Sequence, residues 1–296
     1  MQKSLILSAL VASAFAGAVQ AEELTGTLKK VSDSGIITIG YRESSIPFSY
    51  LDANQKPVGY AMDLCSKVVD AVKKKLNKPS LITKMVPVTS QTRIPLMVNG
   101  TIDMECGSTT NSKERQKQVA FSDHYYVTAV RMLVKANSGI KSLDDLNGKA
   151  VVTTTGTTSD RYIKQNEQGK QIDVKNVYGK DHSESFLMVE TGRASAFVMD
   201  DILLAGLIAN YTNPKEFAIV GPALSVEPYG IMLRKDDPAF KKVADETLAG
   251  IYKSGEINKI YDKWFMQPIP PKNITINLPM SEKLKEAIKS PNDVGI

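Results

Sequence analysis

The sequence predicts an α/β protein with two lobes, and three observations support this fold class. The chain has 296 residues, which is more than one hydrophobic core usually serves. Apolar β-branched runs such as 35–40 alternate with stretches of helical periodicity such as 62–76, which is typical of strands and crossover helices. Arginine, hydroxyl and acidic residues follow several of these runs, at the carboxyl ends of strands, where open α/β sheets bind ligands.

The first half of the chain contains three predicted strands, at residues 35–40, 81–88 and 102–106. A short helix is expected around 28–32. Leu64, Val68, Val72 and Leu76 are spaced four apart, which predicts an amphipathic helix over 62–76. Three lysines, residues 73–75, close that helix and are interpreted as a solvated helix end.

The second half repeats the alternation. Strands are predicted over 130–134, 150–154, 174–178, 195–199, 217–220 and 229–234, and helices from residue 160 and over 143–149, 184–191, 202–210, 236–252 and 257–265. Asp236 and Pro238 open one of these helices and Gly255 stops it. Trp264 is expected to pack between helices, and a polar C-terminal helix follows.

The N-terminus has the pattern of a secretory signal peptide. Lys3 precedes an apolar run at 5–12, and small residues follow at Val19 and Ala21, which predicts cleavage after Ala21. The apolar run is too short to span a bilayer, and no later stretch reaches the roughly 20 apolar residues that a membrane helix needs. No cysteine stands at the cleavage point to carry a lipid anchor, so we expect a soluble protein in the periplasm.

Charge and metal-binding residues exclude several functions. The formal charge of +5 becomes +4 when Lys3 is removed with residues 1–21. The lysines and arginines of the mature chain are scattered along the sequence, so nucleic-acid binding is not expected. Only two histidines are present, His124 and His182, and two cysteines, so no metal site or other cofactor is predicted. In an oxidising compartment Cys65 and Cys106 could form one disulfide or remain free thiols.

Residues 105–115 form the first candidate binding segment. After the strand ending at Cys106, Gly107 allows a close backbone approach, and Asn111 with Glu114 predicts an N-cap and capping box. The hydroxyls of 108–110, the free N–H groups of the helix and Arg115 can converge on a carboxylate. The alternative is an ordinary strand-to-helix junction with a solvated arginine.

Three more segments place polar groups at strand ends. Arg42 and Arg93 each follow a predicted strand, and both could serve a ligand with more than one negative charge. Residues 155–159 repeat the glycine-and-hydroxyl pattern at a helix start but lack a lysine in the Walker A position, so phosphate is the weaker option. Asp200 and Asp201 follow an apolar strand. Helix capping explains Asp201 better than Asp200, which suits a cationic group.

Six segments together carry a resemblance to a known family. They are residues 40–50, 89–96, 105–115, 157–159, 180–182 and 197–201. In combination they resemble the glutamate/aspartate-binding members of the polar amino acid solute-binding proteins of bacterial ABC importers. The resemblance covers essentially the whole mature chain and implies a type II periplasmic-binding fold, two α/β lobes joined by a two-strand hinge. It places lobe 1 at 22–125 and 227–296, lobe 2 at 130–222, and the hinge at 126–129 and 223–226.

The resemblance also implies which residues bind the ligand. The α-carboxylate would be held by Arg115, Thr110, Thr157 and Thr158. The α-ammonium would be held by Asp200 with Ser108. The side-chain carboxylate would be held by Arg42, Ser90, Arg93 and His182. An amide in place of that carboxylate would leave buried guanidinium unmatched, so glutamine should bind far worse.

The expected function is therefore capture of L-glutamate or L-aspartate by lobe closure, followed by delivery to a membrane ABC permease. The protein is expected to be a monomer without catalytic activity. One alternative is a binding protein for glutamine, asparagine or histidine. Another is a dehydratase or lytic transglycosylase on the same fold, which would need a carboxylic acid aimed at a leaving group. A third is the receptor domain of a signalling protein.

Overall fold

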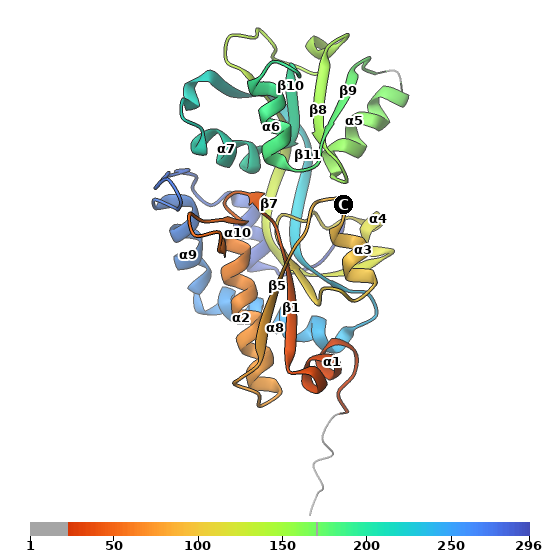
Figure 1. Cartoon of the computed structure of the whole chain (residues 1–296), viewed down its shortest axis with the longest axis vertical. Helices are drawn as coiled ribbons and strands as arrows, with labels where there is room; N and C mark the ends of the chain where they lie inside the picture. Colours follow the sequence, from red (N-terminus) through yellow and green to blue (C-terminus); the bar gives the residue numbers. More distant parts are fainter. Residues whose placement is uncertain (1–22, 170) are drawn as a thin grey trace, which may run out of the picture.

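The computed structural model describes residues 23–169 and 171–296, and its elements alternate as the sequence predicts (Figure 1). The predicted signal peptide, 1–21, lies outside the described residues. The first part contains α1 (Gly26–Ser34), β1 (Ile36–Tyr41), β2 (Ser44–Ser45), β3 (Ser49–Leu51), β4 (Pro57–Val58), α2 (Tyr60–Lys75), β5 (Ile82–Pro87), α3 (Arg93–Val98), β6 (Met104–Cys106), α4 (Lys113–Gln116) and β7 (Val119–Lys135). The middle contains η1 (Asp144–Leu146), β8 (Ala150–Thr154), α5 (Thr158–Gln168), β9 (Lys175–Gly179), α6 (His182–Glu190), β10 (Ala196–Asp200), α7 (Asp201–Asn210) and η2 (Pro214–Glu216). The last part contains β11 (Phe217–Arg234), α8 (Pro238–Ser254), α9 (Glu256–Tyr261), η3 (Asp262–Met266) and α10 (Glu282–Lys289).

An eight-stranded sheet of order β5-β1-β6-β11-β7-β10-β8-β9 runs through the molecule. At one end β1 pairs in parallel with β5 and β6, and at the other β8 pairs in parallel with β9 and β10. Between these parallel groups β7 and β11 pair antiparallel along their length. The carboxyl ends of β1, β5 and β6 therefore lead into loops near the middle of the molecule, where ligands of open α/β sheets bind.

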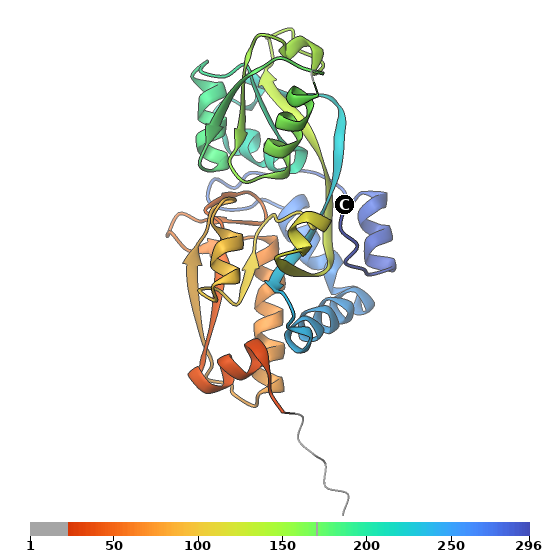
Figure 2. The same cartoon turned by 90° about the vertical axis from the view of Figure 1, so that its right-hand side faces the viewer.

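β7 and β11 connect two halves of the molecule (Figures 1 and 2). The lower half holds β1, β5, α2, α3 and α8, and the upper half holds β8, β9, β10 and α5 to α7. The sequence predicted separate strands at 130–134, 217–220 and 229–234, but each is part of a continuous strand of 17 or 18 residues. The turn-like Gly221 and Pro222 do not end β11, because a register shift between Val220 and Ser225 absorbs them.

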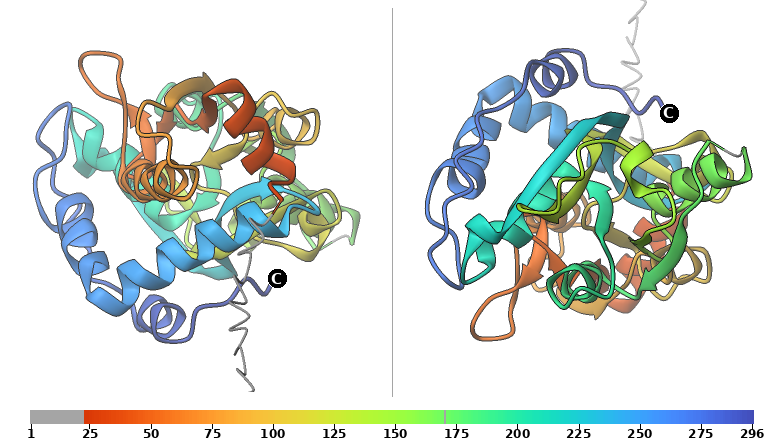
Figure 3. Two further views of the ribbon diagram at one scale, coloured as in Figure 1. Left: turned by 90° about the horizontal axis from the view of Figure 1, so that it is seen from below. Right: turned by 90° about the horizontal axis from the view of Figure 1, so that it is seen from above.

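The predicted helical stripe of α2 packs in the core. Leu64, Val68 and Val72 are fully buried and join a cluster that includes Ile37 and Ile39 of β1. Figure 3 shows the C-terminal helices, in blue, along the outside of the molecule. Trp264 is buried among them as expected, and its Nε1–H donates to Asp63 at 2.7 Å. No helix in the described ranges combines the length and apolar character needed to cross a membrane.

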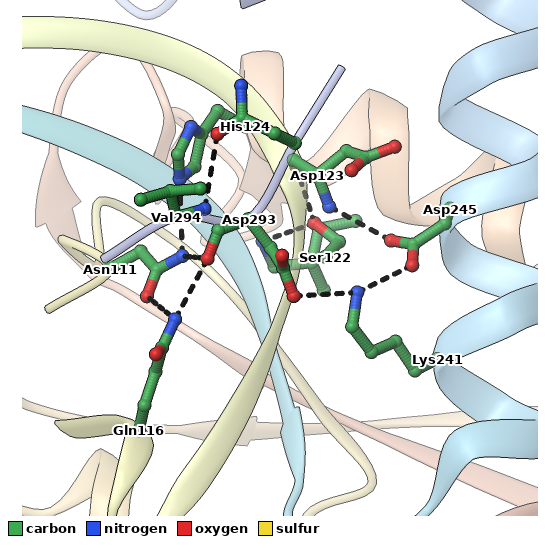
Figure 4. Close-up of polar contacts among 11 residues, drawn as sticks. Asn111, Gln116, Ser122, Asp123, His124, Lys241, Asp245, Asp293 and Val294 are labelled. Carbon is green, nitrogen blue, oxygen red and sulfur yellow. Dashed lines mark hydrogen bonds and ion pairs between the residues drawn. The ribbon is translucent and has the colours of Figure 1, made fainter. Parts of the chain in front are cut away.

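The C-terminal segment, residues 291–296, is bound beside the start of α4, and Figure 4 shows its Asp293 next to Asn111 and Gln116. The backbone N–H of His124 donates to the Asn292 carbonyl at 3.0 Å, and the Asn111 amide donates to the Asp293 carbonyl at 2.8 Å. The Asp293 carboxylate forms an ion pair with Lys241 of α8 at 3.1 Å. The segment thus joins α8, the start of β7 and the loop before α4.

Cys65 and Cys106 form a disulfide, the alternative that the sequence left open. Cys65 lies in α2 and Cys106 ends β6, and both are fully buried. Because Cys106 directly precedes Gly107, the bond ties the core helix α2 to the start of the loop that carries residues 108–110.

Removing this disulfide should destabilise the fold. The bond joins residues 41 apart in sequence, so the double substitution Cys65→Ala and Cys106→Ala is expected to lower the free energy of unfolding by roughly 2–4 kcal/mol. Urea unfolding followed by circular dichroism measures this change, and the wild-type protein with and without reductant is the control. An unchanged unfolding midpoint in the double variant would contradict the expectation.

Candidate functional site

Three buried arginines gather at strand ends of the lower half. Arg42 follows β1, Arg93 begins α3 after β5, and Arg115 lies in α4, with exposed fractions of 1%, 2% and 7%. The sequence analysis predicted that these guanidiniums serve one site, and the structure buries all three. Burial of a guanidinium is expensive unless carbonyls, hydroxyls or anions compensate its charge.

Arg115 reaches from the lower half to the upper half. Its Nη1 donates to the Thr110 carbonyl at 2.8 Å, and its Nη2 donates to the Gly156 carbonyl in the loop before α5 at 3.2 Å. Burial, followed by repulsion from Arg93, lowers the pKa of Arg115 to about 9, so the side chain stays cationic at neutral pH.

The predicted N-cap of α4 is wrong. Ser112, not Asn111, caps the helix by accepting the backbone N–H of Arg115 at 3.3 Å. The Asn111 amide instead contacts His124 and the Asp293 carbonyl (Figure 4). The C-terminal segment binds the Asn111 side chain in place of the helix N-terminus. Because that segment is distant in the sequence, residues near Asn111 give no sign of this contact.

Arg42 contacts His182 of the upper half. Its Nη2 lies 3.3 Å from His182 Nε2, and His182 Nδ1 lies 3.1 Å from the Thr154 hydroxyl. Burial, followed by the charge of Arg42, lowers the pKa of His182 well below its usual value, so the imidazole is neutral at neutral pH. Because arginine can only donate, Nε2 accepts and Nδ1 carries the proton. Burial and then Arg93 lower the pKa of Arg42 itself to about 10.

Arg93 is held by the loop after β6. Its Nη1 donates to the Thr109 hydroxyl at 2.6 Å and to the Ser108 carbonyl at 3.5 Å. The Thr109 hydroxyl in turn donates to the Glu105 carboxylate at 2.6 Å. Burial lowers the pKa of Arg93, and the charge of Glu105 opposes this effect.

Asp200 brings a buried carboxyl group from the upper half. It ends β10, is 1% exposed, and accepts a hydrogen bond from the Tyr229 hydroxyl. Burial, followed by repulsion from Glu227, raises the pKa of Asp200 well above its usual value. Asp201 does not cap α7 as the sequence analysis suggested, since it is the first helical residue and its carboxylate accepts from Thr128.

The predicted hydroxyl residues are all buried, with different local partners. The Ser108 hydroxyl donates to Ser45 at 3.3 Å, and the Thr158 hydroxyl donates to Glu227 at 2.9 Å. The Thr157 hydroxyl donates to the Thr154 carbonyl and accepts the Asp160 N–H, so it caps α5 and its own hydrogen bonds are local. These side chains come from both halves of the molecule.

Several of the predicted residues carry buried polar atoms without a hydrogen-bond partner among the described residues. They are Arg42 Nη1, Ser90 Oγ, Arg93 Nε and Asp200 Oδ1. Buried polar groups in proteins are almost always paired, so unpaired donors beside arginines and an unpaired carboxylate oxygen opposite them need an explanation. A small ligand with both negative and positive groups would satisfy donors and acceptor together.

Sequence reasoning missed three further residues beside this site. Glu105, Glu227 and Tyr229 are at most 2% exposed and contact Thr109, Thr158 and Asp200 respectively. Glu105 lies inside a segment that the sequence analysis singled out, although no role was assigned to it. Glu227 and Tyr229 lie in the long strand β11, and nothing local in the sequence distinguishes them.

Comparison with known proteins identifies the family of this chain. Residues 37–267 match the bacterial extracellular solute-binding proteins, family 3. The L-glutamate/L-aspartate-binding protein of Pseudomonas aeruginosa is 54% identical over 291 residues, covering 98% of this chain and 96% of that protein. The glutamate/aspartate import solute-binding protein of Escherichia coli is 50% identical over 285 residues, covering 95% and 94%.

A solved structure extends the likeness to three dimensions. An ancestral arginine-binding protein bound to glutamine matches with a TM-score of 0.69 at 33% identity, over 78% of this chain and 98% of that one. The expected type II periplasmic-binding fold is thereby confirmed. The chain belongs to the bacterial extracellular solute-binding proteins of family 3.

Proposed function

We propose that this protein captures L-glutamate or L-aspartate and delivers it to an ABC-type permease. The observation that carries this function is the gathering of three buried arginines with a buried aspartate of the other half, whose charge acts on Arg93 and Arg115. That pattern is complementary to an amino acid with two carboxylates and one ammonium. Relatives that are at least half identical over nearly the whole chain are glutamate/aspartate-binding proteins.

The α-carboxylate and the α-ammonium of the ligand are assigned to groups around Arg115 and Asp200. The α-carboxylate would bind Arg115, Thr110 and the N-terminus of α5 at residues 157 and 158, where helix N–H groups favour an anion. The α-ammonium would bind Asp200 and Ser108. The Oδ1 of Asp200, which has no hydrogen-bond partner in the described part of the chain, supports this assignment.

The side-chain carboxylate of the ligand is assigned to Arg42, Ser90, Arg93 and His182. Three of these residues bring a buried donor atom without a protein partner among the described residues, namely Arg42, Ser90 and Arg93. A neutral amide would bring a donor group against the guanidiniums and leave part of their charge unmatched. This distal contact favours glutamate and aspartate over glutamine, asparagine and histidine.

Capture is proposed to occur by closure of the two lobes. Arg42 with His182 and Arg115 with Gly156 already contact across the two halves, and a Cβ added to Gly156 would lie 2.8 Å from the Cα of Gln91. We assign residues 22–125 and 227–296 to lobe 1 and residues 130–222 to lobe 2, so that these contacts join the two lobes. The hinge segments, 126–129 and 223–226, lie within β7 and β11. A ligand that contacts both lobes shifts the population towards the closed form.

Its relatives bind solutes, and this protein is likewise a binding protein and not an enzyme. The dehydratase and transglycosylase alternatives would need an acid aimed at a leaving group, whereas Asp200 is matched to an ammonium. We further propose that the protein acts as a monomer in the periplasm after cleavage of residues 1–21.

The ligand assignment predicts a specific selectivity. Glutamate and aspartate should bind, and glutamine should bind roughly 100-fold or more weakly because it leaves guanidinium unmatched. Arg42→Ala and Arg93→Ala should each weaken glutamate binding by roughly 10- to 100-fold and reduce the preference over glutamine. Calorimetric titration measures these affinities, with the exposed Arg193→Ala as control. Unchanged selectivity in both variants would rule out the distal assignment.

Asp200 should make binding depend on pH. Its raised pKa in the free protein means that protonation stabilises the free folded state, and this contribution is lost as pH rises through the folded pKa. An ammonium favours the ionised form, so glutamate affinity should rise with pH through that range. Asp200→Asn should abolish binding, yet should not lower the melting temperature of the free protein at neutral pH. Retained binding by this variant would contradict the role of Asp200.

Lobe closure should depend on the close approach at Gly156. Glutamate should reduce the radius of gyration of the wild-type protein in X-ray scattering. Gly156→Ala should bind more weakly and compact less, because its Cβ would collide with Gln91. Gly139→Ala is the matched control, since Gly139 also has a positive φ but no atom within 4 Å of an added Cβ. Equal behaviour of the two variants would argue against closure at this contact.

A further inference from the structure

Glu105 is a buried acid for which the proposed ligand contacts give no role. It lies in the short central strand β6, where it is paired with Gly40 of β1 and Met232 of β11. Its exposed fraction is 0%. Acids are almost never fully buried unless a partner compensates their charge, so its position beside the arginines calls for a physical reason.

The Glu105 carboxylate is linked to Arg93 through a hydrogen-bonded hydroxyl and lies close to the side chain of Arg42. Its Oε2 accepts from the Thr109 hydroxyl at 2.6 Å, and the same hydroxyl accepts from Arg93 Nη1 at 2.6 Å. On the other side only Gly107 separates it from Arg42, because a Cβ added to Gly107 would lie 2.3 Å from Glu105 Oε1 and 2.8 Å from Arg42 Cγ. The attraction of Glu105 raises the pKa of both Arg42 and Arg93, opposing the effect of burial.

The charges around the distal carboxylate can be counted. Among the buried groups, Arg42 and Arg93 formally contribute two positive charges and Glu105 one negative charge, while the neutral imidazole of His182 contributes none. Asp181 also attracts Arg42, but it is partly exposed, so solvent screens its charge. The sum is one positive charge. A single distal carboxylate brings this sum to zero, whereas an amide leaves it positive and a dianionic group makes it negative.

We propose that Glu105 is a specificity-determining residue that sets the distal end of the site to one net positive charge, so that it accepts a singly charged acidic group and rejects a doubly charged one. This inference rests on the proposed function. Glu105 acts through Thr109 and Arg93 and through its field on Arg42, so it is a positioning residue and needs no contact with the ligand.

Two ligands of similar shape and size, which differ in the charge of the distal group, test the effect of that charge on binding. L-homocysteate ends in a sulfonate with one negative charge, and L-2-amino-4-phosphonobutanoate ends in a phosphonate that carries two at mildly alkaline pH. Calorimetry with the wild-type protein should find the sulfonate bound about tenfold or more tightly than the phosphonate, which corresponds to one unfavourable charge in a buried site. Equal affinities of the wild type for the two ligands would overturn the proposal.

Glu105→Gln should change this ratio. The variant keeps an acceptor for Thr109 but leaves two net positive charges, so the ratio should move towards the phosphonate by about tenfold or more. Glu105→Asp should keep the wild-type preference, and Glu246→Gln on the exposed face of α8 is the charge-matched control. Thr109→Val should weaken both ligands alike, because it loosens Arg93 without changing the charge.

The outcomes distinguish this inference from the proposed function. If the wild type fails to bind glutamate, the proposed function fails. If it binds glutamate but Glu105→Gln shows the same sulfonate-to-phosphonate ratio as the wild type, only the role of Glu105 is wrong. Should Glu105→Gln not fold, equal affinities of the wild type for the two ligands still overturn the proposal, and a changed ratio in Glu105→Asp would contradict the role of the charge at residue 105.

Discussion

The burial of three like-charged guanidiniums in one region is the constraint on which the rest of this structure depends. Removing such groups from water is costly, and their mutual repulsion adds to that cost. The chain offsets it with acceptors of different kinds: the carbonyls of Thr110 and Gly156 for Arg115, the hydroxyl of Thr109 for Arg93, and a neutral imidazole for Arg42. The site is therefore held in a cationic state before any ligand arrives, and an anionic ligand is the natural completion of its charge balance.

The long strands β7 and β11 explain how such a site can be shared between two halves. Both strands continue through the region that joins the halves, and their pairing keeps backbone groups hydrogen-bonded there. A double-stranded connection resists twisting more than a single loop does, but can bend where its register shifts. Groups on opposite sides, such as His182 and Arg42, can therefore approach each other along a limited range of directions.

The sequence predicted most of the fold because strands and helices leave local signals, and polar residues after strands indicated Arg42, Arg93, Arg115 and Asp200, which the structure buries, while their roles toward a ligand stay a prediction. β-branched runs, the spacing of Leu64 to Val72 and polar residues after strands are visible within short windows. The errors have a shared origin in distant contacts. The sequence predicts Asn111 as a helix cap, but a segment about 180 residues later binds it. The turn-like Gly221 and Pro222 predict an end to the strand, but a register shift against β7 accommodates them and β11 continues. No local sequence pattern marks Glu105 as part of the site. Its proposed role depends on Arg42 and Arg93, which belong to other elements.

Residues 291–296 support a part of the binding site that is weak on its own. α4 has only four residues, too few to be stable without tertiary support, and the carbonyl of Ile296 accepts the N–H of its first residue, Lys113. Arg115 sits on this helix, so its firm placement depends on a segment far away in the sequence. Loosening residues 291–296 would therefore also loosen one cationic anchor of the site.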